Sequence, residues 1–211
     1  SLKNLKDREE RFLLRLLPSH QFEAWKSSGK TSLETYDDVI VLRADLSGFS
    51  SLIGTMNPDE LLDILEGYFN RFKKACDAHD LRFVRTDGSS FIVVGGTEGS
   101  SVTPRQALVA AMEMFQSTEE LNKMLSAEIT ALVLRVGIHL GQVDVGVPQD
   151  RVVGYDFWGD GFEECRALEL ACEPGEILMS KKAFESEVPG QQWPSFTMKT
   201  IGLKEVLVFR P

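Results

Sequence analysis

The sequence has no long hydrophobic run, few cysteines and fewer basic than acidic side chains. Its longest apolar runs, such as 39–42 and 91–94, are far shorter than the roughly 20 residues that cross a bilayer, so we expect no transmembrane helix. The first residues also lack the apolar core of a signal peptide. A formal net charge of -9 argues against a large nucleic-acid surface. We therefore expect a cytoplasmic protein, or the soluble part of a membrane-anchored or multidomain one, that does not bind nucleic acid.

Cysteine and histidine are too scarce and too scattered to indicate a disulfide framework or a zinc site. The number of cysteines is odd, which fits a reducing compartment, and none has a partner at metal-ligand spacing. We interpret all three as small core residues. They are Cys76, Cys165 and Cys172.

The chain has 211 residues, of which 43% are hydrophobic and 26% charged, as in one globular domain with an appended segment. Residues 1–35 are predicted to be a helical lead-in and linker, because leucines recur at helical spacing until Pro18. This lead-in is either a short amphipathic helix of the same domain or the end of a coiled coil from an upstream sensor. Residues 36–211 are predicted to be the main domain.

The main domain begins with alternating strand and helix signals. Asn57 is a suitable N-cap and Pro58 a suitable first residue for the first helix. Asp87 and Gly88 suit a tight turn between two strands. This order predicts an α+β fold with a ferredoxin-like βαββαβ core, in which helices cover one face of an antiparallel sheet. The expected strands are 39–44, 81–86, 89–96 and 131–141, and the second helix is 104–125.

Four segments resemble the class III adenylyl and guanylyl cyclase catalytic domain, and they occur in the order found in that family. The resemblance extends from about residue 16 to residue 209. It implies conversion of ATP or another nucleoside triphosphate to a cyclic nucleotide, with Mg²⁺ or Mn²⁺. It also implies a homodimer or heterodimer with shared sites, and an upstream sensor domain in the same chain. The segments are RADLSGFSSL (43–52), RVGIHLGQV (135–143), YDFWGD (155–160) and EPGEILMS (173–180).

The resemblance places the family's first metal-binding aspartate at Asp45, at the end of the first strand. The alternative is that Asp45 is only a turn residue. Ser89 stands where the family has its second metal-binding aspartate, and a neutral hydroxyl compensates a dication poorly. Asp87 is either a substitute ligand or a turn former. The loop after Asp45 would offer backbone groups to a triphosphate. This loop consists of Leu46, Ser47, Gly48 and Phe49.

By the same resemblance, Arg85 and Asp156 occupy the positions of the pair that reads the purine. An aspartate accepts from the adenine amino group and a cation faces a ring nitrogen, so the pair looks adenine-like. Arginine is larger than the usual lysine, which leaves open that Arg85 is only a solvated strand residue. The choice between ATP and GTP also stays open.

The family's catalytic asparagine and arginine fall on Glu163 and Ala167, so we assign no residue a catalytic role. Arg166 is adjacent, but one helical step turns a side chain by about 100°. His139 is interpreted as a core or hydrogen-bonded histidine, and Lys204 is not assigned to a phosphate. The sequence therefore predicts a weak or inactive pseudo-cyclase that dimerises and binds nucleotide. The alternatives are half of an active heterodimer, or an active homodimer in which Asp87 and Arg166 take over.

Overall fold

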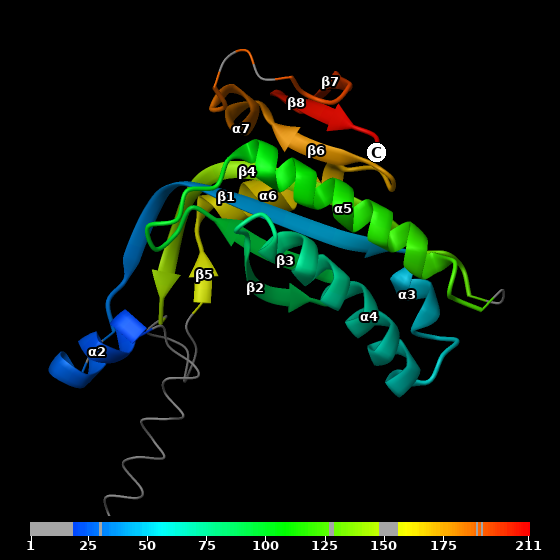
Figure 1. Ribbon diagram of the computed structural model, residues 1–211, viewed down its shortest axis with the longest axis horizontal. Helices are drawn as coiled ribbons and strands as arrows, with labels where there is room; N and C mark the ends of the chain where they lie inside the picture. Colours follow the sequence, from blue (N-terminus) through cyan, green and yellow to red (C-terminus); the bar gives the residue numbers. More distant parts are fainter. Residues whose placement is uncertain (1–18, 30, 127–128, 148–155, 189, 191) are drawn as a thin grey trace, which may run out of the picture.

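A computed structural model describes residues 19–29, 31–126, 129–147, 156–188, 190 and 192–211 of the chain. These residues form one sheet of eight strands with helices on both faces (Figure 1). No helix of this described part is both long and apolar enough to cross a membrane. The elements, in chain order, are α2 (Ser19–Ser28), β1 (Glu34–Ser47), α3 (Phe49–Leu52), α4 (Pro58–Asp77), β2 (Arg82–Asp87), β3 (Ser90–Gly95), α5 (Pro104–Asn122), β4 (Val133–Gly146), β5 (Asp156–Trp158), α6 (Asp160–Ala171), β6 (Ile177–Ser180), α7 (Lys181–Glu185), β7 (Phe196–Ile201) and β8 (Lys204–Phe209).

The predicted βαββαβ core is confirmed. It consists of β1, α4, β2, β3, α5 and β4, and its strands lie in the order β2-β3-β1-β4, with every neighbouring pair antiparallel. This is the strand order of the ferredoxin-like arrangement. The sheet continues from β4 through β6, which is parallel to β4, to the β8–β7 hairpin, and β5 pairs with the far end of β4.

Alternation along β1 divides the core into two layers, because successive side chains of a strand point to opposite faces. Ile40 and Leu42 pack with α4 and α5 on one face, whereas Val39 and Val41 pack with α6 on the other. Figure 1 shows α4 and α5 in front of the sheet and α6 behind it. The two core helices therefore share one face, as predicted, and the later helix α6 covers the second.

The start of α4 is also confirmed. Asn57 is its N-cap, and its side-chain oxygen accepts a hydrogen bond of 3.2 Å from the backbone N–H of Asp59. Pro58 is the first helical residue, where the missing N–H costs nothing because no helical carbonyl would be available to it. The three cysteines are buried and free, as predicted.

Several predicted boundaries are wrong. The first strand begins at Glu34 rather than at residue 39, and α2 was not predicted, because both segments are polar. Strand β2 runs through Asp87, so the hairpin turn consists of Gly88, with a φ of 58°, and Ser89. Helix α5 ends at Asn122, three residues early. The expected lead-in helix before Pro18 lies outside the described residues.

Gly137 and Gly141 of β4 permit the close packing of helix α6. A Cβ atom on Gly137 would lie 2.8 Å from the carbonyl oxygen of Cys165 and 2.8 Å from the backbone nitrogen of Glu169. A Cβ on Gly141 would lie 2.9 Å from the Cα of Gly161. Helix α6 therefore rests directly on the backbone of β4, and this contact positions one wall of the site described next.

Candidate functional site

The end of β1 brings two charged side chains to the face that α6 covers. Arg43 and Asp45 follow Val41 at intervals of two residues, so they lie on the same side of the sheet. The strand register places Asp45 opposite Ser90 of β3 and opposite Arg135 of β4. Asp45 is therefore flanked by a hydroxyl on one neighbouring strand and by a guanidinium on the other.

Both carboxylate oxygens of Asp45 have partners. Oδ1 accepts hydrogen bonds from Ser89 Oγ at 2.7 Å and from Ser90 Oγ at 3.4 Å. Oδ2 accepts from Arg135 Nε at 3.0 Å, and Arg135 Nη2 lies 2.9 Å from the same oxygen. The residue is only 8% exposed. The carboxylate is thus buried, paired with the Arg135 guanidinium at one oxygen and hydrogen-bonded by the Ser89 hydroxyl at the other.

The ion pairs continue from Arg135 across the sheet to the hairpin. Arg135 Nη2 lies 2.8 Å from Glu169 Oε1, and Arg43 Nε donates to Glu169 Oε2 at 3.1 Å. Arg43 Nη2 donates to Asp87 at 3.0 Å and to Ser90 Oγ at 3.1 Å. We call the chain of Asp45, Arg135, Glu169, Arg43 and Asp87 the arginine–carboxylate network. Its charges alternate in sign along its length.

The carboxylate of Glu169 is the buried centre of this network, with its side chain 2% exposed. Burial raises the pKa of Glu169 above its usual value, and the nearby Arg135 and Arg43 partly oppose that rise. Burial alone would lower the pKa of Arg43, but the hydrogen bonds to Asp87 and Glu169 raise it above its usual value. The guanidinium is therefore charged, and a buried charge of this kind is stable only because it is paired.

The residues that the resemblance assigns to metal binding do not fit a site for two dications. Asp45 already has a cation at one oxygen and hydroxyl donors at the other, and Asp87 is bonded to Arg43. The rest of the described chain offers no group of three side chains suited to hold an ion. Mg²⁺ and Ca²⁺ sites need several oxygen ligands that are not already neutralised. The predicted ligand pair, Asp45 and Asp87, is thus separated by arginines rather than joined.

The structure does bring Arg85 and Asp156 together, although they are far apart in sequence. Arg85 Nη1 donates to Asp156 Oδ1 and, at 3.0 Å, to the carbonyl oxygen of Phe157. The guanidinium also lies over the Phe162 ring, 5.4 Å from its centroid. Arg85 is therefore held in place by three contacts. Its side chain is 40% exposed, so Arg85 is both partly solvated and paired.

A cavity of about 320 Å³ opens between the β2–β3 hairpin and the start of α6. The polar side chains that line it include three arginines and two carboxylates. Arg166 is one of them, whereas Ala167 is not, so the expectation that one helical step would turn Arg166 away is wrong for this cavity. We call this space the arginine cavity. Its charged lining consists of Arg43, Arg85, Asp87, Glu163 and Arg166.

The predicted loop after Asp45 is not a loop, because β1 runs through Ser47 and α3 begins at Phe49, and this segment offers little more than backbone to a ligand. The side chains of Leu46 and Phe49 are buried in the core, and Gly48 has a φ of 94°, which favours glycine. The backbone N–H of Leu46 donates to the carbonyl oxygen of Ser89 at 3.3 Å. Ser47 and Gly48 are therefore the members of the predicted loop that reach the surface. No contact of the described residues tests their predicted role.

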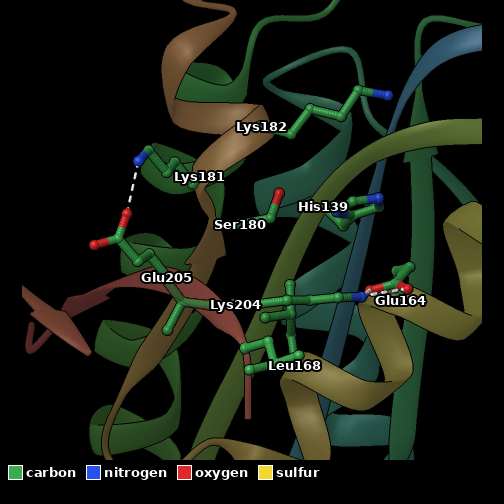
Figure 2. A pocket seen from close by; sticks show the side chains of 10 residues that line it. His139, Glu164, Leu168, Ser180, Lys181, Lys182, Lys204 and Glu205 are labelled. Carbon is green, nitrogen blue, oxygen red and sulfur yellow. Dashed lines mark hydrogen bonds and ion pairs between the residues drawn. The ribbon is translucent and has the colours of Figure 1, made fainter. Parts of the chain in front are cut away.

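A second cavity, of about 420 Å³, lies between α6, α7 and the β7–β8 turn (Figure 2). Two of its lysines are already paired: Lys204 with Glu164, and Lys181 with Glu205 at 2.6 Å. His139 also lines it, with its Nδ1 buried and without a hydrogen-bond partner in the described part of the chain. Burial lowers the pKa of His139 to about 4, so the ring is neutral. His139 is thus a partly buried core residue, as predicted.

Three residues of the arginine–carboxylate network were missed by the sequence analysis: Arg43, Arg135 and Glu169. Arg43 carried one usable signal, because it precedes Asp45 by two residues in a strand and must share its face. The pairing of Arg135 with Asp45 depends on the register of β1 and β4, and the contact of Glu169 depends on how α6 packs. Neither can be obtained from local sequence patterns.

The class of protein that fits this structure is the class III nucleotide cyclase domain. The features that fit are the βαββαβ sheet, the carboxylate near the end of its first strand, and the cavity between its hairpin and a later helix. The chain belongs to the family described as Adenylate and Guanylate cyclase catalytic domain, whose model matches residues 31–202.

Named relatives agree with this assignment. The chain is 29% identical to an adenylate cyclase of Mycobacterium tuberculosis over 181 residues, 85% of this chain and 40% of that protein. It is 26% identical to the soluble guanylate cyclase subunit beta-2 of Rattus norvegicus over 84% of this chain and 26% of that protein. The chain therefore spans less than half the length of these relatives. The adenylyl cyclase CyaB from P. aeruginosa has the same fold, with a TM-score of 0.69, 22% identity, and coverage of 85% and 95% of the two chains.

Proposed function

We propose that the chain is a cyclase homology domain that dimerises and binds a nucleotide but makes little or no cyclic nucleotide. The family membership supports the nucleotide and the dimer. The contact of Arg85 with Asp156 supports a base-binding end of the site, because it preorganises a cation and a carboxylate at one edge of the arginine cavity. The family reaction would be the conversion of ATP to cyclic AMP and pyrophosphate.

The observation that carries the proposal is the chemistry at positions 163 and 167. The resemblance assigns these positions to the asparagine and arginine that contact the ribose and the transition-state phosphate. Here Glu163 brings a negative charge to the cavity wall, and Ala167 has no donor and does not line the cavity. The loss of one such donor commonly costs about 100-fold to 1000-fold in rate. Ser89 adds the loss of a metal-binding carboxylate.

The test is to incubate the purified domain with ATP or GTP and Mg²⁺ or Mn²⁺, and to measure cyclic nucleotide by mass spectrometry. The domain of CyaB serves as the positive control. We expect a rate at least about 1000-fold below that control, because two transition-state contacts are missing. Turnover within tenfold of the control would refute the proposal. Sedimentation velocity over a concentration series tests the dimer separately.

The second candidate is an active adenylyl cyclase in which displaced residues act. The position of Arg166 in the arginine cavity favours it, since this side chain makes no ion pair with the described residues and faces the space where a phosphate would lie. Under this candidate, Arg166→Ala would abolish a measurable turnover and Arg71→Ala would not. An active heterodimer half is distinguished by adding a partner domain, because turnover would then appear only in the mixture.

The remaining partners are part of the proposal. A sensor domain elsewhere in the same protein is supported by the relatives, which are more than twice as long as this chain. A cytoplasmic location is supported by three free, buried cysteines and by a nucleotide ligand. Recovery of the full-length protein and identification of its other domains would test the first point directly.

A further inference from the structure

The cation that accompanies Asp45 in this protein is a guanidinium. Arg135 approaches Oδ2 with two nitrogen atoms, Nε at 3.0 Å and Nη2 at 2.9 Å, and the same side chain reaches Glu169. A dication at Asp45 would have to displace Arg135 or lie beside it. Displacement would leave Glu169, which is buried, with Arg43 as its remaining cation. Coexistence would place like charges within a few ångströms of each other in a poorly solvated site.

Some N–H donors of the arginine cavity make no hydrogen bond within the described structure and are available to an anion. Arg166 is exposed and has no hydrogen bond or ion pair among the described residues, and the Nη1 atom of Arg43 has none either. Both side chains line the cavity. Guanidinium groups bind phosphate oxygens through paired N–H donors without needing a metal ion.

The charge around the cavity limits how much negative charge a ligand can carry. The arginine cavity and the arginine–carboxylate network joined to it hold four arginines and five carboxylates, so their formal charges sum to -1. A triphosphate without metal carries several negative charges and would meet Glu163 at the cavity wall. A single phosphate group needs only the donors that are present. The nine groups are Arg43, Arg85, Arg135, Arg166, Asp45, Asp87, Asp156, Glu163 and Glu169.

We propose that this site binds a nucleoside monophosphate, as a monoester or a cyclic diester, without a divalent metal. Arg135 takes the place of the cation at Asp45, and Arg43 and Arg166 donate to the phosphate. This inference rests on the nucleotide binding proposed above. It specifies the class of nucleotide and states that binding needs no divalent metal. A domain of this kind responds to a nucleotide rather than producing one.

The metal part is tested by electron paramagnetic resonance of Mn²⁺ alone, since binding removes the signal of the free ion. We expect no stoichiometric binding to the wild-type domain at submillimolar Mn²⁺. Binding of one equivalent that is lost in Asp45→Asn would overturn this part. The measurement needs no turnover and no nucleotide, so it stands even if the proposed function fails.

The ligand part is tested by calorimetric titration with AMP, cyclic AMP and ATP, each in EDTA and in Mg²⁺. We expect AMP or cyclic AMP to bind equally well in both buffers, and ATP in EDTA to bind at least about 10-fold more weakly than the better monophosphate, because its extra charges have no partners. Comparison of AMP with cyclic AMP distinguishes the monoester from the diester. Tighter binding of ATP with Mg²⁺, abolished by EDTA, would overturn the proposal.

A matched pair of variants locates the site. Arg166→Ala removes an exposed side chain with no partner in the described structure, so the domain should fold, and we expect monophosphate affinity to fall at least about 10-fold, as for a lost charged hydrogen bond. Arg71→Ala removes an exposed arginine of α4, which pairs with Glu120 on the opposite face, and should leave affinity unchanged. Equal affinities of the two variants would overturn the assignment. Absence of binding by all three nucleotides would overturn the ligand proposal. This outcome is distinct from cyclic nucleotide production, which would overturn the proposed lack of turnover.

Discussion

The contact between Gly137 and α6 offers a test of how the site is built. In Gly137→Ala, the new Cβ would lie 2.8 Å from the carbonyl oxygen of Cys165 and 2.8 Å from the backbone nitrogen of Glu169. Real Cβ atoms do not approach other heavy atoms so closely. Both contacts are with backbone, so no side-chain rotation can relieve them. Helix α6 must move away from β4, or β4 must bend.

The expected cost follows from the number and kind of clashes. Overpacking of a well-packed core commonly costs about 1–3 kcal/mol. Two backbone contacts on one helix place this variant near the upper end, at about 3 kcal/mol of unfolding free energy. For a domain of this size that corresponds to a fall in Tm of about 6–12 °C. Helix α6 also carries Glu169, so its displacement should loosen the arginine–carboxylate network.

The matched control is Gly67→Ala in the middle of α4. A Cβ on Gly67 would meet no other atom within 4 Å. Because alanine favours the helix over glycine, we expect this variant to be more stable by about 0.5–1 kcal/mol. Urea unfolding followed by circular dichroism and tryptophan fluorescence gives both values. If Gly137→Ala were as stable as the wild-type domain, the close packing of α6 on β4 would be refuted.

Three further predictions concern stability and reactivity. Burial lowers the pKa of His139 to about 4, so between about pH 6.5 and pH 4 the imidazole binds a proton in the unfolded chain but not in the folded domain. The free energy of unfolding should therefore decrease as the pH is lowered through this window. His139→Phe should remove about 2 kcal/mol of that decrease, as measured by urea titrations at several pH values. Asn122 bonds the hydroxyl of Tyr68 and both backbone groups of Leu132, so Asn122→Ala should cost about 2–4 kcal/mol in the same assay, and Tyr68→Phe, which keeps the backbone contacts, about 1 kcal/mol. Burial raises the pKa of every cysteine thiol to about 11 or 12, so a thiol reagent should label the folded domain negligibly and the unfolded chain fully, as mass spectrometry would show.

The core of the fold could be predicted because its signals are local. The capping residue Asn57 and the following Pro58 mark the start of α4, and the alternation of β1 marks its buried faces. Boundaries were less accurate where several outcomes have similar local energies. Asp87 is a good turn residue, yet the structure pairs it with Ser90 at the end of β2 and leaves the turn to Gly88 and Ser89. The bond from Arg43 to Asp87 stabilises this arrangement, and it comes from another strand.

Residues of the site were predictable only where the family resemblance marks their positions. The family resemblance pointed to Asp45 near the end of β1, and it also pointed to Arg85 and Asp156 as a pair. The contacts of Asp45 come from Arg135, which is 90 residues away along the chain. Such contacts depend on strand register and helix docking, which are decided by the whole core rather than by neighbouring residues. The sequence analysis therefore paired Arg85 with Asp156, as the structure does, but it did not pair Asp45 with Arg135.

The arginine–carboxylate network also gives Ser89 a structural role. Where a second carboxylate would demand a dication, the Ser89 hydroxyl instead donates to Asp45, and Arg135 supplies the single positive charge that one carboxylate needs. If Arg135 moved away, the buried carboxylate of Glu169 would lose one of its two cations. The ion pairs therefore hold Arg135 in place without a ligand. If the proposed function holds, an aspartate introduced at position 89 should therefore add an unpaired negative charge rather than a metal site.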